Sequence, residues 1–90
     1  MEIIEKLKII NPLGLNLRAS AELVKTTSRF KCRILIENQH VKADAKSLLN
    51  LMDLRAVYGS EIKVTFEGED AWEAQKTIRA LFLGELAVAV

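Results

Sequence analysis

The stretch EIKVTFEGEDAWEAQKTIRALFLG, residues 61–84, decides the fold class because its apolar residues change period partway along. Apolar and polar residues alternate over residues 61–67, which predicts a strand with one buried face. Gly68-Glu69-Asp70 breaks this alternation, and helical spacing follows it. The predicted buried face of this helix consists of Ala71, Ala74, Ile78, Leu81 and Phe82. We expect Asp70 and Glu73 to form a capping box at its start.

The remainder of the chain shows the same two periods, so the element order extends back to the N-terminus. These periods predict strands over 2–10, 32–37 and 40–43, and helices over 17–27 and 48–54. We expect Asn38-Gln39 to form the tight turn between the second and third strands. The predicted buried stripe of the first helix is Leu17, Ser20, Ala21, Leu23, Val24 and Thr27. The order is β-α-β-β-α-β-α, an α+β fold in which three helices cover one face of a four-stranded antiparallel sheet.

The composition describes one small globular domain and excludes several classes of partner. Of the 90 residues, 50% are hydrophobic and 28% are charged, a balance typical of folded proteins. Lys and Arg total 13 against 12 for Asp and Glu, a net charge of +1, whereas nucleic-acid binders carry a basic excess. No apolar run reaches the roughly 18 residues of a membrane span, and the first residues do not resemble a signal peptide. We expect a cytoplasmic domain with no nucleic-acid or membrane partner.

The sequence offers few residues for catalysis or metal binding. The single cysteine, Cys32, and the single histidine, His40, exclude a disulfide framework and a metal site built from several Cys or several His ligands. Cys32 falls on the apolar face of its predicted strand, so we expect a buried, inert thiol. His40 falls at a hairpin edge, where we expect it to be solvated. The P-loop, G-x-S-x-G, G-x-G-x-x-G and H-E-x-x-H motifs do not occur. We predict a binding protein and not an enzyme, with no metal and no cofactor.

Two predicted helix starts carry groups that suit anion binding or modification. The first places the backbone N–H groups around Asn16 and Leu17 near the guanidinium of Arg18, which makes a candidate anion site. The second places the hydroxyl of Ser47 at a cap position, directly after Lys46. Asn and Ser are also preferred caps for structural reasons alone. Spacing alone therefore favours an ordinary Asn cap with a surface arginine at the first start, and an ordinary Ser cap at the second.

Together these segments resemble the HPr family of the bacterial sugar phosphotransferase system. The similar residues are 11–15, 18, 21–25 and 28–30 in the first loop and helix, 45–47 and 51–52 around the second helix, and 67–71 and 73–74 at the start of the last helix. The resemblance covers a domain at residues 1–85 and implies the open-faced β-sandwich of that family. It leaves an apolar tail, residues 86–90, outside the domain.

The resemblance implies that the phosphocarrier chemistry of the family is lost. Typical members read Gly-Leu-His-Ala-Arg-Pro, with a histidine that accepts phosphate from enzyme I, whereas this chain reads Gly14-Leu15-Asn16-Leu17-Arg18-Ala19. The resemblance therefore puts Asn16 in the place of the histidine. A carboxamide is neutral and weakly nucleophilic, so it cannot replace an imidazole in this role. Catabolite-repression HPr-like proteins also lack the histidine, and the chain is similar to them.

The resemblance also implies a regulatory site. Ser47 matches the serine that HPr kinase/phosphorylase modifies in family members that have it. The docking residues implied around that serine are Leu15, Lys46, Leu48, Leu51 and Met52. We hypothesise a regulatory adaptor whose partners are that kinase and a transcriptional regulator or metabolic enzyme. The alternatives are a competitor that binds enzyme I or sugar-transport enzymes without phosphotransfer, and an assembly domain that uses the tail at 86–90.

Overall fold

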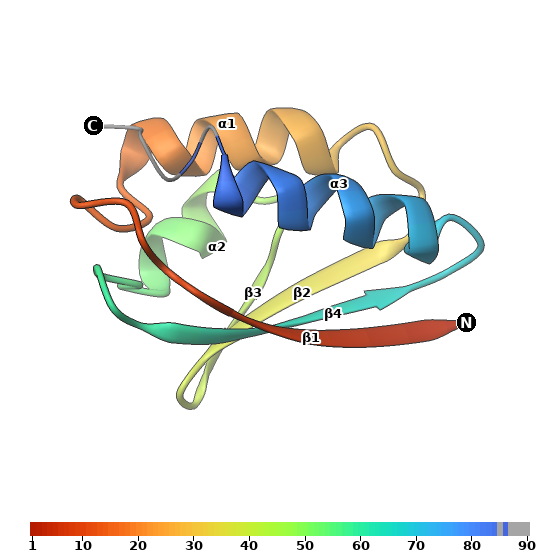
Figure 1. The fold of residues 1–90 in the computed structure, drawn as a ribbon, viewed down its shortest axis with the longest axis horizontal. Coiled ribbons are helices and arrows are strands. Elements are labelled where there is room, and N and C mark those ends of the chain that lie inside the picture. Colours follow the sequence, from red (N-terminus) through yellow and green to blue (C-terminus); the bar gives the residue numbers. More distant parts are fainter. Residues whose placement is uncertain (85, 87–90) are drawn as a thin grey trace.

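The computed structural model describes residues 1–84 and 86, and within them the elements occur in the predicted order (Figure 1). The strands are β1 (Glu2–Lys8), β2 (Arg33–Asn38), β3 (Val41–Asp44) and β4 (Glu61–Glu67). The helices are α1 (Leu17–Thr27), α2 (Leu48–Asp53) and α3 (Ala71–Leu83). None of these helices combines the length and the apolar composition that a membrane span requires.

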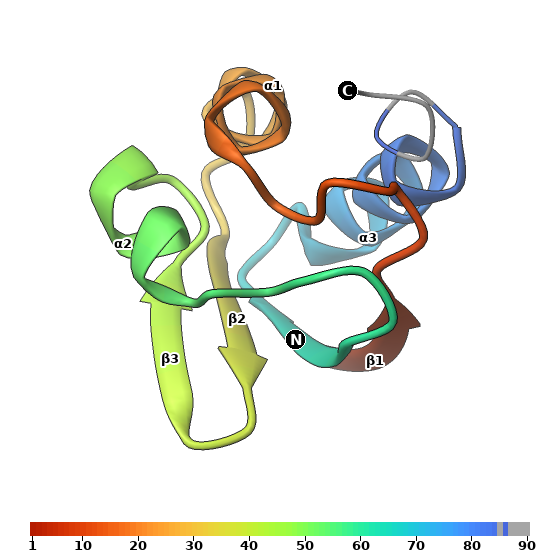
Figure 2. The same cartoon turned by 90° about the vertical axis from the view of Figure 1, so that its left-hand side faces the viewer.

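The sheet has the strand order β1-β4-β2-β3, and every neighbouring pair is antiparallel. β4 lies inside the sheet, since its Ile62 pairs with Leu7 of β1 and its Val64 pairs with Ile36 of β2. The three helices lie on one face of this sheet, and the other face is open (Figures 1 and 2). This arrangement confirms the predicted α+β fold and open-faced β-sandwich.

The alternation in β4 produces the centre of the core. Its apolar side chains Ile62, Val64 and Phe66 are all 0% exposed, because they point from the central strand toward the helices. On α3, Ile78 and Ala74 are equally buried. At roughly 25 cal/mol per Å² of buried apolar surface, such side chains supply most of the stabilisation of a domain this small.

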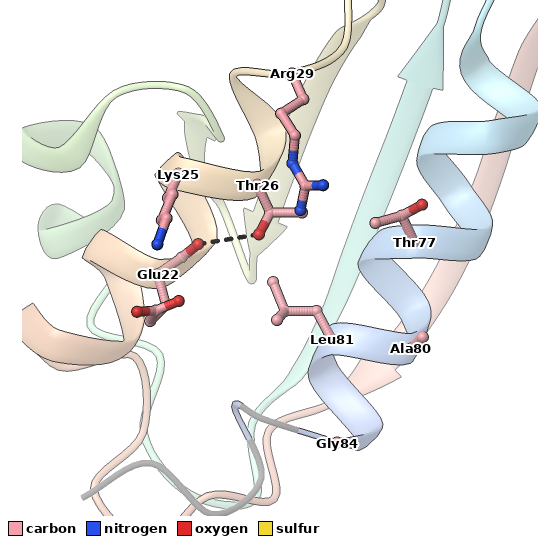
Figure 3. A pocket seen from close by; sticks show the side chains of 8 residues that line it. All are labelled: Glu22, Lys25, Thr26, Arg29, Thr77, Ala80, Leu81 and Gly84. Atoms are coloured by element: carbon pink, nitrogen blue, oxygen red, sulfur yellow. Dashed lines mark hydrogen bonds between the residues drawn. The ribbon is translucent and has the colours of Figure 1, made fainter.

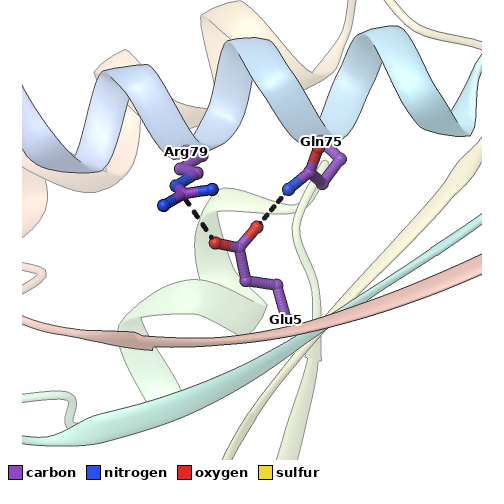
Figure 4. A network of polar contacts seen from close by, with 3 residues as sticks. All are labelled: Glu5, Gln75 and Arg79. Carbon is purple, nitrogen blue, oxygen red and sulfur yellow. Dashed lines mark hydrogen bonds and ion pairs between the residues drawn. The ribbon is translucent and has the colours of Figure 1, made fainter.

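Glu5 of β1 also faces the helices, because it pairs with Val64 in the sheet and therefore shares its face. Its carboxylate does not lie there unpaired. Gln75 of α3 donates a hydrogen bond to Glu5 Oε1, and Arg79 Nε lies 3.3 Å from Glu5 Oε2 (Figure 4). This network fixes α3 over the edge strand β1.

The buried face of α1 differs from the predicted stripe. Leu17 and Ala21 are exposed, whereas Ala19 and Thr26 are buried. The two threonines near the end of the helix are buried with hydrogen-bond partners for their hydroxyls. Thr26 Oγ1 donates to Glu22 O at 3.2 Å, and Thr27 Oγ1 donates to Ala45 O at 2.8 Å. Hydrogen-bonded threonines can enter a core that a polar side chain without a partner would avoid.

The turn between β2 and β3 lies one residue later than predicted, at Gln39 and His40. Gln39 adopts a positive φ of 57°. Asn38 instead completes β2, where it pairs with Val41, and its Nδ2 donates to Leu54 O at 2.9 Å. This contact with the residue that follows α2 fixes the register, and no local pattern reveals it.

Asp70 caps α3 by position but not with its side chain, so the predicted capping box with Glu73 is wrong. The two carboxylate oxygens of Asp70 accept hydrogen bonds from the backbone N–H groups of Lys31 and Cys32, each at 2.8 Å. The Lys31 N–H, and to a smaller extent that of Cys32, lowers the pKa of Asp70 below its ordinary value. The carboxylate thus ties the start of α3 to the chain that enters β2.

The predicted tail at 86–90 is described only at its first residue. Leu86 is 1% exposed and belongs to the hydrophobic core. Residues 87–90 lie outside the described residues. The domain boundary after residue 85 and the assembly role of the tail therefore stay predictions.

Candidate functional site

The start of α1 has the predicted asparagine cap. Asn16 has extended backbone angles, and its Oδ1 accepts a hydrogen bond from Ala19 N at 2.9 Å. Leu17 and Arg18 follow it in the first turn, with exposed side chains. The predicted anion site therefore lies at the surface, around a carboxamide that is already engaged as a cap. Anion binding there stays a prediction.

The loop before α1 packs tightly against the segment that follows α2. Gly14 has a φ of +66°, and a Cβ added there would lie 2.4 Å from Ala56 O and 2.8 Å from Val57 Cα. Leu15 N donates to the same Ala56 carbonyl at 2.8 Å. Glycine is needed here both for its backbone angle and for the close approach. The contact holds the start of α1 beside the end of α2.

The start of α2 has the predicted serine cap. Ser47 Oγ accepts a hydrogen bond from Asn50 N at 3.3 Å. The residues before it are also ordered by hydrogen bonds, since Lys46 N donates to Asp44 Oδ1 at 2.9 Å. The ammonium of Lys46 donates to Phe30 O at 2.5 Å, at the end of the chain segment that follows α1. Ser47 is therefore held in a defined loop, and its side chain is only partly buried.

The predicted docking residues divide into two groups. Lys46 and Leu48 are partly exposed and Met52 is 38% exposed, whereas Leu15 and Leu51 are 5% and 0% exposed. Leu15 and Leu51 therefore belong to the core and present no exposed surface to a partner in this structure, and docking around Ser47 stays a prediction. A short helix that packs Leu51 inward turns the residue two positions earlier almost to the opposite side, at about 100° per residue.

That residue is Leu49, which the sequence prediction missed. Leu49 is 78% exposed, the highest value among the large hydrophobic side chains of the described residues. Leu17 of α1 is 60% exposed, and Val57 and Tyr58, beyond α2, are 63% and 65% exposed. The sequence of α2 carries no signal that identifies Leu49, because leucines occupy positions 48, 49 and 51 and do not show which of them turns inward.

Cys32 and His40 are not brought to either helix start. Cys32 is buried at the entry to β2, where burial, with a smaller effect of the Asp70 carboxylate, raises the pKa of its thiol to about 11. His40 is exposed in the β2–β3 turn, which projects away from the helices (Figure 1). Among the residues described, no three His, Cys, Asp or Glu side chains gather as a metal site would require.

Comparisons with known proteins identify the family. The family model for the PTS HPr component phosphorylation site matches residues 3–83. A phosphocarrier protein HPr from Xylella fastidiosa is 36% identical over 77 residues, 86% of each chain. The HPr-like protein Crh of Bacillus subtilis is 32% identical, over 84% of this chain and 89% of its own.

Solved structures agree with these sequence matches. HPr-C-His from Thermoanaerobacter tengcongensis has a TM-score of 0.91 and 31% identity, over 98% of this chain and 99% of its own. A crystal structure of Bacillus subtilis Crh has a TM-score of 0.71 and 32% identity, over 88% and 91%. With this fold, this site geometry and these relatives, the chain belongs to the HPr family.

Proposed function

We propose that this HPr-family protein is a regulatory adaptor without phosphocarrier activity, and that it acts through Ser47 in bacterial carbon or metabolic control. The observation that carries the proposal is the pair of capped helix starts. The first presents a carboxamide, Asn16, and the second presents a hydroxyl, Ser47. Of these two groups, only the hydroxyl can accept a stable phosphoryl group.

The loss of phosphotransfer follows from the chemistry of Asn16. A phosphocarrier needs an imidazole nitrogen, which is nucleophilic near neutral pH and forms a phosphoramidate reactive enough to pass its phosphate on. Asn16 provides no such nitrogen, and its oxygen accepts the Ala19 N–H. His40 cannot substitute, because it lies in the β2–β3 turn and not at a helix start.

A phosphate on Ser47 would be tolerated by the fold and would change its surface. It adds about −1.5 to −2 charges at a helix N-terminus, where the dipole favours an anion by roughly 0.3–1 kcal/mol at an exposed position. The new charge would lie at the start of the helix that carries the exposed side chains of Leu49 and Met52. A partner that contacts this apolar surface and pairs with the phosphate would distinguish the modified form from the unmodified one.

The partners that fit this role are an HPr kinase/phosphorylase, which would modify Ser47, and a cytoplasmic transcriptional regulator or metabolic enzyme, which would recognise the product. To test the modification, the protein and its Ser47→Ala variant are incubated with ATP and the kinase, and the phosphate is mapped by mass spectrometry. We expect one phosphate, on Ser47, and none on the variant. Absence of label under conditions that modify a histidine-containing HPr would refute the switch.

The second candidate function is competition with phosphocarrier HPr for its enzymes. The exposed positions of Leu17 and Arg18 at the start of α1 favour it, because enzyme I is a partner of the family and these residues lie at the surface beside Asn16. A titration of the isotopically labelled protein with enzyme I tests this candidate. Saturable shifts of Leu17, Arg18 and Leu49 are expected, and no shift would remove it.

Replacement of Asn16 by histidine tests whether one residue separates this chain from a phosphocarrier. We expect Asn16→His to accept phosphate from enzyme I poorly, because Leu17 and Ala19 also differ from the Ala and Pro of typical members. The measurement is acid-labile phosphate after incubation with enzyme I and phosphoenolpyruvate. Efficient transfer would show that Leu17 and Ala19 do not impair the site.

A further inference from the structure

A groove of about 430 Å³ opens between α1 and α3, outside both helix starts (Figure 3). Its lining residues repeat at i, i+3, i+4 and i+7 on both sides, so one continuous face of each chain segment forms each wall. The α1 side, including the residue just beyond the helix, provides Glu22, Lys25, Thr26 and Arg29. The α3 side, including its cap, provides Thr77, Ala80, Leu81 and Gly84.

The two walls differ in chemistry. On the α1 side, Lys25 and Arg29 are exposed and one helical turn apart. The ion pairs within residues 1–84 and 86 are Lys63–Glu37 and Arg79–Glu5, so neither of these cations forms an ion pair with a described carboxylate. Glu22 lies on the same wall, one turn before Lys25, so the wall carries two cations against one carboxylate and is basic on balance. On the α3 side, Ala80 is exposed and Leu81 is partly buried against the core. Figure 3 shows the Leu81 side chain directed into the gap toward α1.

We propose that this groove binds an acidic, amphipathic helical segment of a partner protein. The basic wall and the apolar wall match the two faces of such a helix. The α1 wall extends over seven residue steps, about 10 Å at 1.5 Å per residue, which is two turns of a bound helix. Carboxylates one turn apart on the segment would meet Lys25 and Arg29, and a leucine-like side chain between them would contact Leu81.

This surface is independent of the proposed role of Ser47, because none of its lining residues belongs to α2 or to the caps of α1 and α2. The same protein would therefore carry two binding faces. One face would respond to modification at α2, and the other would hold a constant partner. An adaptor needs two such faces in order to connect two molecules.

The test is an amide-shift titration of the isotopically labelled full chain with the peptide acetyl-EALEELAE-amide. We expect saturable shifts concentrated at Lys25, Thr26, Arg29, Thr77 and Leu81. The double variant Lys25→Glu/Arg29→Glu should weaken binding at least tenfold, and the exposed-site variant Ala80→Glu should weaken it independently. The matched control Lys8→Glu/Lys42→Glu removes two exposed cations from the sheet and should leave binding unchanged.

Three outcomes would overturn the proposal. The first is the absence of saturable shifts at millimolar peptide. The second is equal binding by a peptide in which every Leu and Ala is replaced by Gly, or equal binding by inorganic phosphate. Either result would indicate simple attraction of anions to the positive charges of Lys25 and Arg29. The third is equal loss of binding in the control variant, which would show that only the net charge matters.

Discussion

The N-termini of α1 and α2 share one capping geometry and differ in the chemistry of the cap. Asn16 Oδ1 accepts from Ala19 N at 2.9 Å, and Ser47 Oγ accepts from Asn50 N at 3.3 Å. In each case the side chain satisfies a backbone donor that has no partner within the helix. A carboxamide and a hydroxyl therefore fill the same structural role at a helix start, although only the hydroxyl can be phosphorylated. In this chain we propose that only the α2 start retains a group that accepts phosphate.

The two starts are also linked through the packing around them. Gly14, before α1, contacts Ala56 and Val57, which follow α2. Thr27, at the end of α1, donates to the carbonyl of Ala45, which precedes α2. The α1 helix is therefore attached to both ends of the α2 segment, and changes in either region should be tested for stability as well as for function.

The strongest destabilisation should come from disrupting the contact between Gly14 and the segment that follows α2. Gly14→Ala forces a positive φ on a residue with a side chain and drives its Cβ into Ala56 and Val57, so we expect a loss of about 3 kcal/mol in the free energy of unfolding. Gly59→Ala is the matched control. Gly59 also has a positive φ, but an added Cβ meets nothing within 4 Å, so its loss should be about 1 kcal/mol. Urea unfolding of both variants measures the difference, and equal losses would contradict the proposed close contact.

Substitution of the two capping residues should cause an intermediate loss of stability and allows the two caps to be compared directly. Asn16→Ala and Ser47→Ala each remove one side-chain acceptor, and each should lower the free energy of unfolding by about 1 kcal/mol. Labelling by the kinase separates them, because only Ser47→Ala should abolish it. If Asn16→Ala abolished labelling while the variant remained folded, the two starts would not be functionally distinct.

The smallest change in stability is expected at the start of α3, where the side chain of Asp70 accepts hydrogen bonds from Lys31 and Cys32 and does not cap the helix. The pKa of Asp70 is lowered in the fold, chiefly by the N–H of Lys31. Its carboxylate therefore stabilises the protein above the pKa of the unfolded chain, and this contribution is lost as the pH falls through the lower, folded pKa. Asp70→Asn should flatten the acid limb of stability against pH, measured by thermal unfolding. Glu73→Gln is the matched control, because it removes a carboxylate from the same turn and leaves the hydrogen bonds of Asp70 to Lys31 and Cys32 in place; an equal flattening in this control would contradict the role of Asp70.

The fold was predictable because its periods are unambiguous. Residues 61–67 alternate strictly, and α1 and β4 have the bounds that the sequence pattern predicts. The predictions are wrong where a contact between residues distant in the sequence determines the local structure. Asn38 belongs to β2 because its side chain donates a hydrogen bond to Leu54 O. The side chain of Asp70 does not cap α3 because it accepts a hydrogen bond from the N–H of Lys31, 39 residues away in the sequence.

The candidate site was predictable in its caps but not in its surface. The capping roles of Asn16 and Ser47 were predictable because Asn and Ser are preferred caps, and each accepts a hydrogen bond from a backbone N–H three residues later. The exposure of Leu49 depends on how the six-residue helix α2 is rotated against the core, which the sequence pattern leaves open. The burial of Leu15 depends on the packing of its loop against Ala56, which is distant in the sequence. The groove between α1 and α3 could not be predicted, because it depends on the relative placement of two helices that are separated by more than forty residues.

The loss of carrier chemistry and the retention of the serine switch can be tested in parallel with two phosphate donors. One sample of the protein is incubated with enzyme I and phosphoenolpyruvate, and a second with HPr kinase/phosphorylase and ATP. Intact mass and site mapping are then recorded before and after acid treatment. We predict no phosphate from the first donor and a single acid-stable phosphate on Ser47 from the second. An acid-labile phosphate from enzyme I, or an unmodified Ser47 when a histidine-containing HPr is labelled in parallel, would contradict the account.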